Sequence, residues 1–357
     1  MNLEQILKVA VRGGASDIIL KTGSVPRFRH NGKLVSLSDG ANITPEIMRH
    51  WLDSIVPRRL VNALDEKGDV DFGYNSAISC RFRVNVFKQR GQYGMVLRII
   101  NNNIKTLDEL QLPRVIEKAA TMKRGLVLVT GATGSGKSTT LAAIMQKINT
   151  TRPAHIITIE DPIEFYYKDE LSTVNQREIG EDTMGFAQAL RASLRQDPDI
   201  ILVGELRDEE TTETALMAAE TGHLVFSTLH TKDAVDSLTR LMSYFRPDQH
   251  RSIRIQLANS LKMVVSQRLV SRADGRGRAA AVEILVVNSF VQDVILKGEN
   301  FNPLPEAIRK GTKNYGMQSF DQSLLQMCNA GIISKEQAIA EASSRENMKL
   351  LMSGVNS

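Results

Sequence analysis

The segment that most constrains this chain is a glycine-rich turn placed between an apolar strand and a helix. Residues 126–130 read Leu-Val-Leu-Val-Thr, and residues 131–138 read Gly-Ala-Thr-Gly-Ser-Gly-Lys-Ser. The octet matches G-x-x-x-x-G-K-[S/T], a pattern in which glycines let backbone N–H groups wrap around phosphate oxygens. Four fixed positions occur by chance in about one chain in a hundred of this length, and the preceding strand lowers that figure. The octet therefore predicts a site for a nucleoside triphosphate.

Each residue of this phosphate loop has an expected role. Lys137 would reach the β- and γ-phosphate oxygens, and the Ser138 hydroxyl would ligate Mg²⁺ at the positive end of a helix. The predicted cofactors are thus ATP and Mg²⁺. The remaining predicted ATP contacts are Gly131, Thr133, Gly134, Ser135, Gly136 and Thr139.

Three more apolar runs follow, at residues 156–159, 200–203 and 224–228, and helical stretches separate them. This alternation predicts a parallel α/β sheet covered by helices on both faces. Acidic residues stand where two of the runs end, and the carboxyl ends of strands form the ligand crevice in such sheets. One group lies in the segment Glu160–Glu164, and the other is Glu205, which follows Gly204 where an aspartate is usual. Either Glu205 or a carboxylate of the first segment could be the base.

A histidine stands at each end of the run 224–228. His230 is at the carboxyl end, beside the expected crevice, so it could contact the γ-phosphate. His223 is at the opposite end, where a structural role is the better interpretation.

The first hundred residues predict a smaller α/β unit, a sheet with helices on one face. A helical pattern from Leu3 ends at Gly13-Gly14, a hairpin turn is expected at His30-Asn31-Gly32, and a helix is expected over 47–55. A second hairpin joins 80–87 to 94–100 and places Arg81 and Arg83 on one face, with Arg98 on the returning strand. An exposed strand without function would give the same pattern. A phosphate site, however, commonly needs an arginine from outside its own sheet.

The domain boundaries follow from these patterns. We expect an N-terminal domain over 1–100, a polar linker over 101–113 that ends in Pro113, and a nucleotide-binding domain over 114–357. Apolar residues at helical spacing from Asp248 to Leu269 predict that the last part is a helical subdomain.

Composition excludes several classes of protein. The chain has 42% hydrophobic residues, 24% charged residues and two cysteines, which excludes disorder, a disulfide framework and a four-cysteine zinc module. The net charge of +5 permits an acidic partner, but aromatic residues are only 5% and basic runs are short, so no nucleic-acid partner is expected. Long apolar runs and a signal-peptide core are missing, and we expect a cytoplasmic protein.

Several motifs occur in a characteristic order. They read GATGSGKSTT, ITIEDPIEF, VNQRE, ALRASLRQDPDIILVGELRD and AAETGHLVFSTLHT, followed by SQRLVSR, GRGRAAAVEIL and GMQSFDQSLLQM. Together they resemble the Walker A, Asp-box, Walker B and His-box elements of the secretion ATPases that power type IV pili and type II secretion. The short N-terminal region and the last three motifs are most similar to the pilus retraction branch, whose members hydrolyse ATP to do mechanical work.

The resemblance implies a fold and a set of roles. The fold would be a PAS-like N-terminal domain followed by a RecA-like P-loop ATPase domain, assembled as a homohexamer. Glu164 would be the base that activates water, Glu205 the Walker B glutamate near Mg²⁺, and His230 the phosphate-contacting histidine. Arg83 and Arg98 would be the N-terminal arginines that help to complete a site.

The resemblance also implies partners and a location. These are an inner-membrane pilus platform protein, a paralogous retraction ATPase, and a peripheral position at the cytoplasmic face of the inner membrane. The family's retraction hallmark AIRNLIRE is replaced here by residues 288–297, which favours an accessory, PilU-like motor. The alternatives are a pilus or secretion assembly ATPase, a nucleic-acid translocase, and a non-catalytic partner in a mixed ring.

Overall fold

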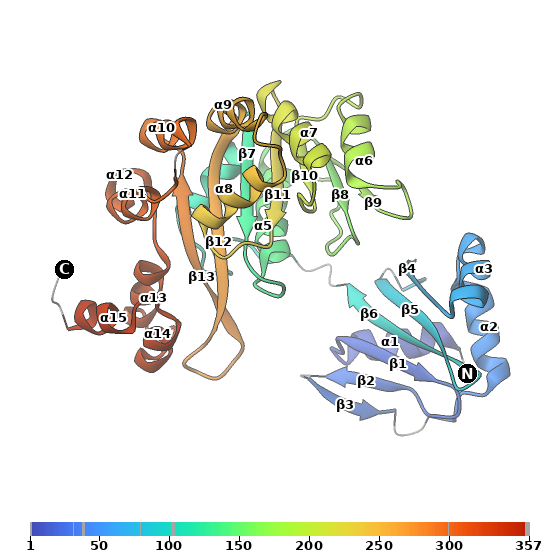
Figure 1. The fold of residues 1–357 in the computed structure, drawn as a ribbon. Helices are drawn as coiled ribbons and strands as arrows, with labels where there is room; N and C mark the ends of the chain where they lie inside the picture. The colour runs from blue at the N-terminus through green and yellow to red at the C-terminus, as the bar shows by residue number, and fades with distance from the viewer. Residues whose placement is uncertain are drawn as a thin grey trace. The chain divides into compact units, whose positions relative to one another are not determined.

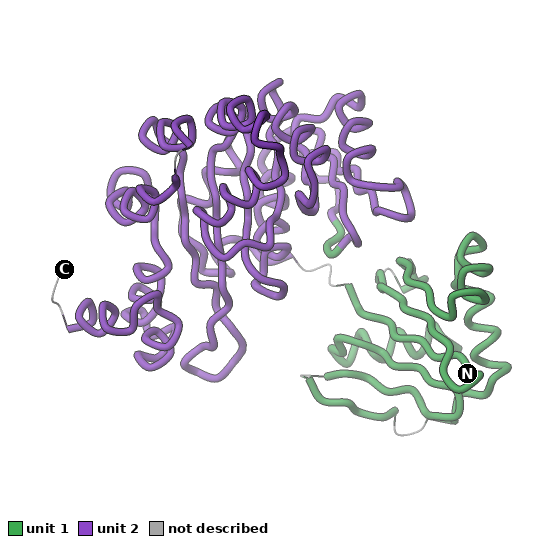
Figure 2. Tube along the Cα trace, in the orientation of Figure 1, with its two compact units in different colours: residues 1–103, 164–166 green, residues 104–163, 167–357 purple. Residues whose placement is uncertain are grey.

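The computed structural model describes residues 2–30, 32–37, 40–78, 80–100, 104–298 and 300–353. The chain divides into two compact units, one of residues 1–103 with 164–166 and one of residues 104–163 with 167–357 (Figure 2). Of the expected linker, residues 101–103 lie outside the described residues, and residues 104–113 group with the second unit. Each unit is described by itself below.

The first unit is an antiparallel six-stranded sheet in the order β3-β2-β1-β6-β5-β4 (Figure 1). Its strands are β1 (Asp17–Lys21), β2 (Arg27–His30), β3 (Lys33–Ser36), β4 (Asp69–Asn75), β5 (Arg81–Gln89) and β6 (Gln92–Ile100). Its helices are α1 (Leu3–Arg12), α2 (Pro45–Ile55) and α3 (Arg58–Lys67). Both predicted hairpins are present: β2 pairs with β3, and β5 pairs with β6. In the predicted turn, Asn31 lies outside the described residues.

The helices of this unit cover one face of the sheet because its strands alternate. Phe82, Val84 and Val86 of β5 are buried, and they share one apolar cluster with residues of all three helices. The side chains between them point to the other face. Arg83 is placed there opposite Arg98 of β6, its direct partner in the antiparallel register.

The second unit is built on a seven-stranded sheet in the order β13-β12-β7-β11-β10-β8-β9. Only β13 runs antiparallel to its neighbour among these strands of the described chain. The strands are β7 (Gly125–Thr130), β8 (His155–Glu160), β9 (Thr173–Glu178), β10 (Ile200–Val203), β11 (Leu224–Leu229), β12 (Leu261–Ser271) and β13 (Arg278–Val286). The predicted parallel α/β sheet is confirmed.

Helices cover both faces of this sheet, and each face has its own apolar core (Figure 1). One layer contains η1 (Arg114–Ile116), α4 (Glu117–Thr121) and α5 (Lys137–Thr151). The other contains α6 (Phe186–Ser193), α7 (Glu209–Glu220), α8 (Ala234–Ser243), α9 (His250–Ser260), α10 (Ser289–Lys297) and α11 (Leu304–Lys310). The central strands β7, β10 and β11 are buried along their whole length and therefore read as continuous apolar runs.

One sequence expectation was wrong. The helical spacing from Asp248 to Leu269 predicted that this stretch belongs to a helical subdomain, but α9 ends at Ser260 and residues Leu261–Ser271 form strand β12. The run Met263–Val265 is buried on both faces of the sheet and pairs with β7 along one edge and β13 along the other. A continuous apolar run of this kind satisfies helical spacing as well as strand spacing.

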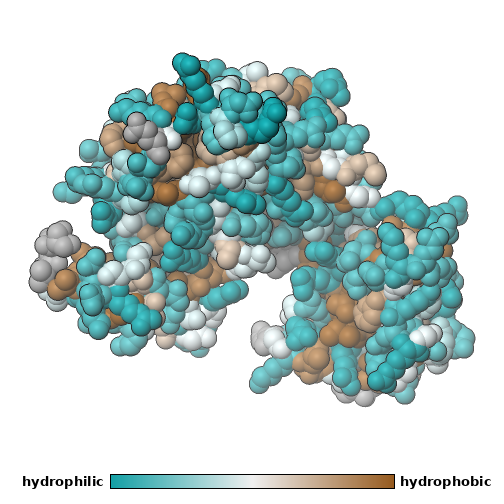
Figure 3. All heavy atoms as spheres, viewed as in Figure 1, coloured by the Kyte–Doolittle hydropathy of each residue, from teal (hydrophilic) through white to brown (hydrophobic). Residues whose placement is uncertain are grey.

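Helices end the chain, as expected. They are α12 (Thr312–Tyr315), α13 (Phe320–Asn329), α14 (Lys335–Glu341) and α15 (Arg345–Met352). Helices α13–α15 form a small separate core with Val270 of β12 and with Ala279 and Ala281 of β13. None of the described helices is long and apolar enough to cross a membrane. In each unit, the face seen in Figure 3 is mostly hydrophilic.

Candidate active site

The sheet of the second unit brings the predicted motifs to one edge. Strands β7, β11, β10 and β8 are parallel neighbours, so their carboxyl ends lie side by side. The phosphate loop follows β7, His230 follows β11, Gly204 and Glu205 follow β10, and Asp161 follows β8. This edge is where an open α/β sheet binds its ligand.

The phosphate loop is closed over the amine of its own lysine. Lys137 begins α5, is only 8% exposed, and donates hydrogen bonds from Nζ to the carbonyls of Gly131 at 2.9 Å and Ala132 at 3.1 Å. Gly136, the residue before the helix, has no capping side chain. The first turn of α5 therefore keeps backbone N–H groups available for phosphate oxygens.

Strand β12 holds the loop at both ends. The Gln267 side chain donates from Nε2 to the Ser135 carbonyl at 2.8 Å, and the Gln267 carbonyl lies 2.4 Å from where a Cβ on Gly131 would be. Gly131 has a φ of 143°, so a side chain would be strained there even without this contact. Gly134 also has a positive φ of 76°, but a Cβ there would meet nothing within 4 Å.

These two glycines give a matched pair of variants. We expect Gly131→Ala to cost about 3 kcal/mol of folding stability, because backbone strain adds to a backbone clash. Gly134→Ala should cost about 1 kcal/mol, because only the left-handed conformation opposes it. Urea denaturation of both variants measures the difference. Equal losses would show that Gln267 does not pack against the loop as described.

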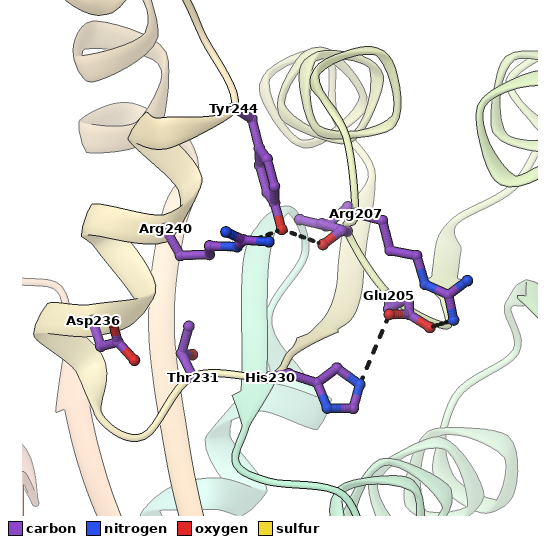
Figure 4. Close-up of a pocket in the computed structure, with 8 residues that line it drawn as sticks. Glu205, Arg207, His230, Thr231, Asp236, Arg240 and Tyr244 are labelled. Atoms are coloured by element: carbon purple, nitrogen blue, oxygen red, sulfur yellow. Dashed lines mark hydrogen bonds and ion pairs between the residues drawn. The ribbon is translucent and has the colours of Figure 1, made fainter.

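The acidic side of the edge is a pocket of about 510 Å³ (Figure 4). Glu205 is held from two directions: the Arg207 guanidinium donates to its Oε1, and His230 Nε2 lies 3.8 Å from its Oε2. Arg207 also lies 3.9 Å from Asp161 after β8. The carboxylate of Glu205 is mostly buried, so these contacts fix its direction.

His230 is set up to be neutral near pH 7. Burial lowers the pKa of its imidazole, and the nearby Lys137 ammonium and Arg207 guanidinium lower it further, against the opposing effect of Glu205. Because the Lys137 charge affects the pKa of His230, the imidazole lies within electrostatic range of the phosphate loop. A neutral imidazole can donate one N–H to a phosphate oxygen without adding a charge.

Gly204, which stands where an aspartate is usual, is closely packed. A Cβ on Gly204 would lie 3.2 Å from the Ile159 carbonyl and 3.3 Å from the Phe186 ring. Gly204 also donates its N–H to Ile159 at 2.8 Å and accepts from Thr228 Oγ1 at 2.6 Å. A larger residue would fit only if Ile159 or Phe186 shifted by a few tenths of an ångström. Glu205 is the carboxylate that follows β10.

The carboxylates after β8 differ in their surroundings. Glu160 accepts hydrogen bonds from Thr158 at 2.6 Å and from Gln176 at 3.2 Å, which holds it to the sheet. Glu164 is exposed and belongs to the short segment that groups with the first unit. Just before it, the Ile163 N–H donates to the buried Glu178 at 3.1 Å, which fixes the start of that segment.

Arg83 and Arg98 are paired with acids inside the first unit. Arg98 Nε donates to Asp17 at 2.9 Å, and Arg83 Nε lies 3.8 Å from Asp71. Burial raises the pKa of Asp17, but the hydrogen bonds from Arg98 and Ser16 outweigh it and lower the pKa overall. Both arginine side chains remain exposed, at 47% and 68%. Asp71 is exposed as well, so its pair with Arg83 is weak, whereas Asp17 is buried.

Of the two histidines, His223 has a local structural contact. Its Nδ1 lies 3.0 Å from the Ala218 carbonyl at the end of α7. This contact fits the structural interpretation of His223.

The sequence did not point to two features of the site. Arg240 of α8 and Tyr244, the residue after that helix, line the Glu205 pocket, and Tyr244 donates to the Leu206 carbonyl at 2.9 Å (Figure 4). A second pocket of about 450 Å³ adjoins Gly136 and Thr139. Its other walls are Lys105, Glu109, Leu110, Gln111, Leu112, Thr140, Gln267, Leu269, Arg272, Arg276, Gly277, Arg278, Ala279 and Ala280. In the sequence, Gln267 is a polar residue within the otherwise apolar run of β12, and this interruption could have indicated a site there.

Comparisons with known proteins found relatives over nearly the whole chain. Residues 1–340 match the family model described as Type II/IV secretion system protein. The chain is 40% identical to the type IV pilus ATPase PilU of Pseudomonas aeruginosa, over 99% of this chain and 91% of that protein. It is also 40% identical to the type IV pilus retraction ATPase PilT of the same organism, over 97% of this chain and all of that protein.

Solved structures give the same result. A crystal structure of the pilus retraction motor PilT with bound ADP matches with a TM-score of 0.89 and 42% identity, covering 98% of this chain and 99% of that one. The ATPase DotB of Legionella pneumophila matches with a TM-score of 0.80 and 31% identity, covering 99% of this chain and 96% of that one. The resemblance to the pilus retraction branch is confirmed. The chain therefore belongs to the type II/IV secretion system protein family, which includes these pilus retraction ATPases.

Proposed function

We propose that this chain is an ATP-hydrolysing motor that drives type IV pilus retraction. The observation that carries the proposal is the full-length likeness to the ADP-bound retraction motor, which includes both units and not the phosphate loop alone. PilU and PilT match this chain with equal identity. The replacement of AIRNLIRE by residues 288–297 supports the accessory, PilU-like alternative.

The second unit has the groups that ATP requires. The phosphate loop with Lys137 would hold the phosphates, and the pocket beside Gly136 and Thr139 would hold the nucleoside, with Leu269 offering an apolar surface to the base. The basic residues of the same pocket suit a negatively charged ligand. We propose that Thr133, Gly134, Ser135, Ser138 and Thr139 complete the contacts.

The residues present also fit Mg²⁺. Within the described residues, no group of three or more His, Cys, Asp or Glu side chains could hold a metal ion. Mg²⁺ does not need such a cage, because it keeps several waters and binds through one or two protein oxygens plus substrate phosphates. The Ser138 hydroxyl and the Glu205 carboxylate would hold it. When bound, it would neutralise developing charge on the phosphates.

The hydrolysis step needs a base, a positioned water and charge stabilisation. We propose that Glu164 accepts the proton of the attacking water, since its carboxylate is exposed whereas Glu205 is held by Arg207 and His230. Neutral His230 would donate to the γ-phosphate, and its contact with Glu205 would transmit the loss of that phosphate to β10.

Arg83 and Arg98 would act from a neighbouring subunit of a homohexameric ring. The ion pair of Arg83 with Asp71 is exposed on both sides, so exchanging it for a phosphate costs about 1 kcal/mol or less. Exchanging the pair of Arg98 with Asp17 costs more, because Asp17 is buried and accepts a hydrogen bond from Arg98. Nucleotide at one site would then fix the position of the N-terminal unit next to it, and hydrolysis would release that unit. Movement of the ring follows from this release.

A mixing experiment tests this arrangement. Subunits with Arg83→Ala and Arg98→Ala are combined with Glu164→Gln subunits, each inactive alone. Donation between subunits creates some interfaces where intact arginines meet an intact base, so we expect partial recovery of ATP hydrolysis in verified mixed rings. If the arginines act on their own subunit's site, every site stays broken and no activity returns.

The proposed partners follow from the same function. The ring would work at the cytoplasmic face of the inner membrane against the pilus platform protein, with a paralogous retraction ATPase as a second partner. The rival function is a nucleic-acid translocase, which the basic pI of about 9.1 permits. ATP turnover by the purified chain, measured with and without single-stranded DNA, separates the two. Turnover that single-stranded DNA strongly stimulates would favour the translocase.

A further inference from the structure

Three polar residues lie in one row across adjacent strands of the second unit's sheet. Thr130 ends β7, Ser266 of β12 is its register partner, and Glu283 of β13 is the register partner of Ser266. Thr130 Oγ1 donates to Ser266 Oγ at 2.9 Å, so both hydroxyls point to the same face. The row continues a face that is otherwise apolar, with Leu128 and Val264 two residues earlier in the same core.

Helix α8 is attached to this polar row at its N-terminal turn. Glu283 Oε1 accepts from the Ala234 N–H at 2.9 Å, where the first turn of a helix has no internal partner. One turn later, Ser237 Oγ lies 3.5 Å from Thr130 Oγ1 and donates to the Asp233 carbonyl at 2.7 Å. The helix thus meets both ends of the row: it is held by a hydrogen bond at Glu283, and Ser237 lies against Thr130 without a proton left to donate to it.

The same helix turn holds the segment that carries His230. Thr231, directly after His230, lies 2.7 Å from Ser237 through its hydroxyl and is only 4% exposed. Directly after α8, Tyr244 donates to the Leu206 carbonyl beside Glu205. Helix α8 and the residue after it therefore contact Thr130 before the phosphate loop, Thr231 after His230, and Leu206 after Glu205.

We propose that Glu283 is a positioning residue for ATP hydrolysis, which acts through Ala234 and α8 to fix His230 relative to the phosphate loop. The inference rests on the proposed hydrolysis and assigns Glu283 no contact with the nucleotide. Its argument is geometric: β13 is two strands away from the loop, yet its carboxylate is the group that accepts the first N–H of α8.

The surroundings of Glu283 explain why its contact is important. Burial raises the pKa of its carboxyl to about 7, against the lowering effect of the Ala234 hydrogen bond; Asp233 and Asp321 raise it, and Arg268 lowers it. Moving a carboxyl partly out of water costs free energy, and the hydrogen bond from Ala234 offsets part of that cost. With a low dielectric around it, the hydrogen bond to α8 is stronger than the same contact would be in water.

The test replaces Glu283 in the full-length chain. Glu283→Met keeps the length of the side chain but cannot accept from Ala234, so we expect kcat to fall at least tenfold while the dissociation constant for ADP stays within threefold. Glu283→Gln keeps an accepting oxygen and should retain kcat within threefold. Ser323→Ala is the matched control, because Ser323 accepts from the neighbouring Val282 N–H but belongs to α13. Its kcat should be unchanged.

Each result decides the proposal. A Met variant with wild-type kcat, or a Gln variant as inactive as Met, would overturn it. If the Met variant does not fold, Thr231→Val removes the hydroxyl contact between Thr231 and Ser237, through which α8 holds the His230 segment. We expect that variant to lower kcat at least fivefold with ADP binding retained. Unchanged kcat in Thr231→Val also overturns the proposal. A wild-type chain without ATP hydrolysis would instead refute the proposed function.

A pH series tests the placement on which the proposal depends. Because the folded pKa of Glu283 is raised to about 7, its contribution to stability is present at low pH and is lost as pH rises toward and through 7. The Gln variant has no such loss, so its Tm relative to wild type should rise between pH 5.5 and pH 8. A Tm difference that stays constant with pH would show that Glu283 is not buried against α8.

Discussion

Replacing Lys137 with alanine is expected to abolish ATP hydrolysis and to weaken nucleotide binding. The variant loses the main cation for the phosphates, and it also loses the two hydrogen bonds that close the loop onto Gly131 and Ala132. Removing one preorganised donor from a catalytic site typically costs about 100- to 1,000-fold in kcat, and the loss of loop closure adds to that. Steady-state ATP hydrolysis and ADP calorimetry measure the two effects.

A second lysine on the same helix provides the control. Lys147 is exposed on α5, so Lys147→Ala removes the same charge without touching the loop. It should leave both kcat and ADP affinity within twofold of wild type. Hydrolysis that survives in Lys137→Ala would contradict the assignment of the phosphate site.

Glu164→Gln is expected to lower kcat by about 100- to 10,000-fold while ATP still binds. A base that activates water acts mainly in the transition state, so its loss affects turnover far more than ground-state affinity. Glutamine has nearly the same shape but cannot accept a proton at neutral pH. Single-turnover hydrolysis together with binding of a non-hydrolysable ATP analogue separates the two quantities.

Glu205→Gln is the informative comparison for this variant. Glu205 is held by Arg207 and lies near His230, so its replacement should disturb the pocket and lower both metal-dependent binding and turnover. If Glu205→Gln abolishes turnover with ATP binding intact and Glu164→Gln does not, the base is Glu205.

Local patterns in the sequence were enough to predict the edge of the sheet that carries the site. Residues 126–130 and the octet after them are contiguous, and so are β10 with Glu205 and β11 with His230. Because parallel strands present their carboxyl ends at the same edge, the order of these motifs implied that they would meet. Helices α1 and α2 of the first unit were likewise predictable, since Gly13-Gly14 follows α1 directly, whereas α3 was not predicted.

Strand β12 shows where prediction from local sequence fails. Its apolar residues fit helical spacing, and only its pairing with β7 on one side and β13 on the other makes it a strand. Strand β9 was missed because its residues are polar, whereas those of β12 are apolar enough to suit a helix. It is a polar edge strand, Thr173–Glu178, with too little apolar alternation to be recognised.

Contacts between distant segments could not be predicted at all. Gln267 holds the Ser135 carbonyl across 132 residues, and Glu283 reaches Ala234 across 49. Nothing in the local sequence of either pair indicates its partner. The second pocket has the same origin, because its walls come from both the start of the second unit and the β12–β13 hairpin.

The central claim is that ATP hydrolysis by this chain drives pilus retraction, and direct observation of labelled pili tests it. The host strain that lacks this gene is complemented with wild type or with Glu164→Gln, and retraction events per pilus and stall force are recorded. A motor of either the principal or the accessory kind predicts that deletion lowers these values, that wild type restores them and that Glu164→Gln does not. Retraction that is unchanged by deletion, or fully restored by Glu164→Gln, would contradict the account.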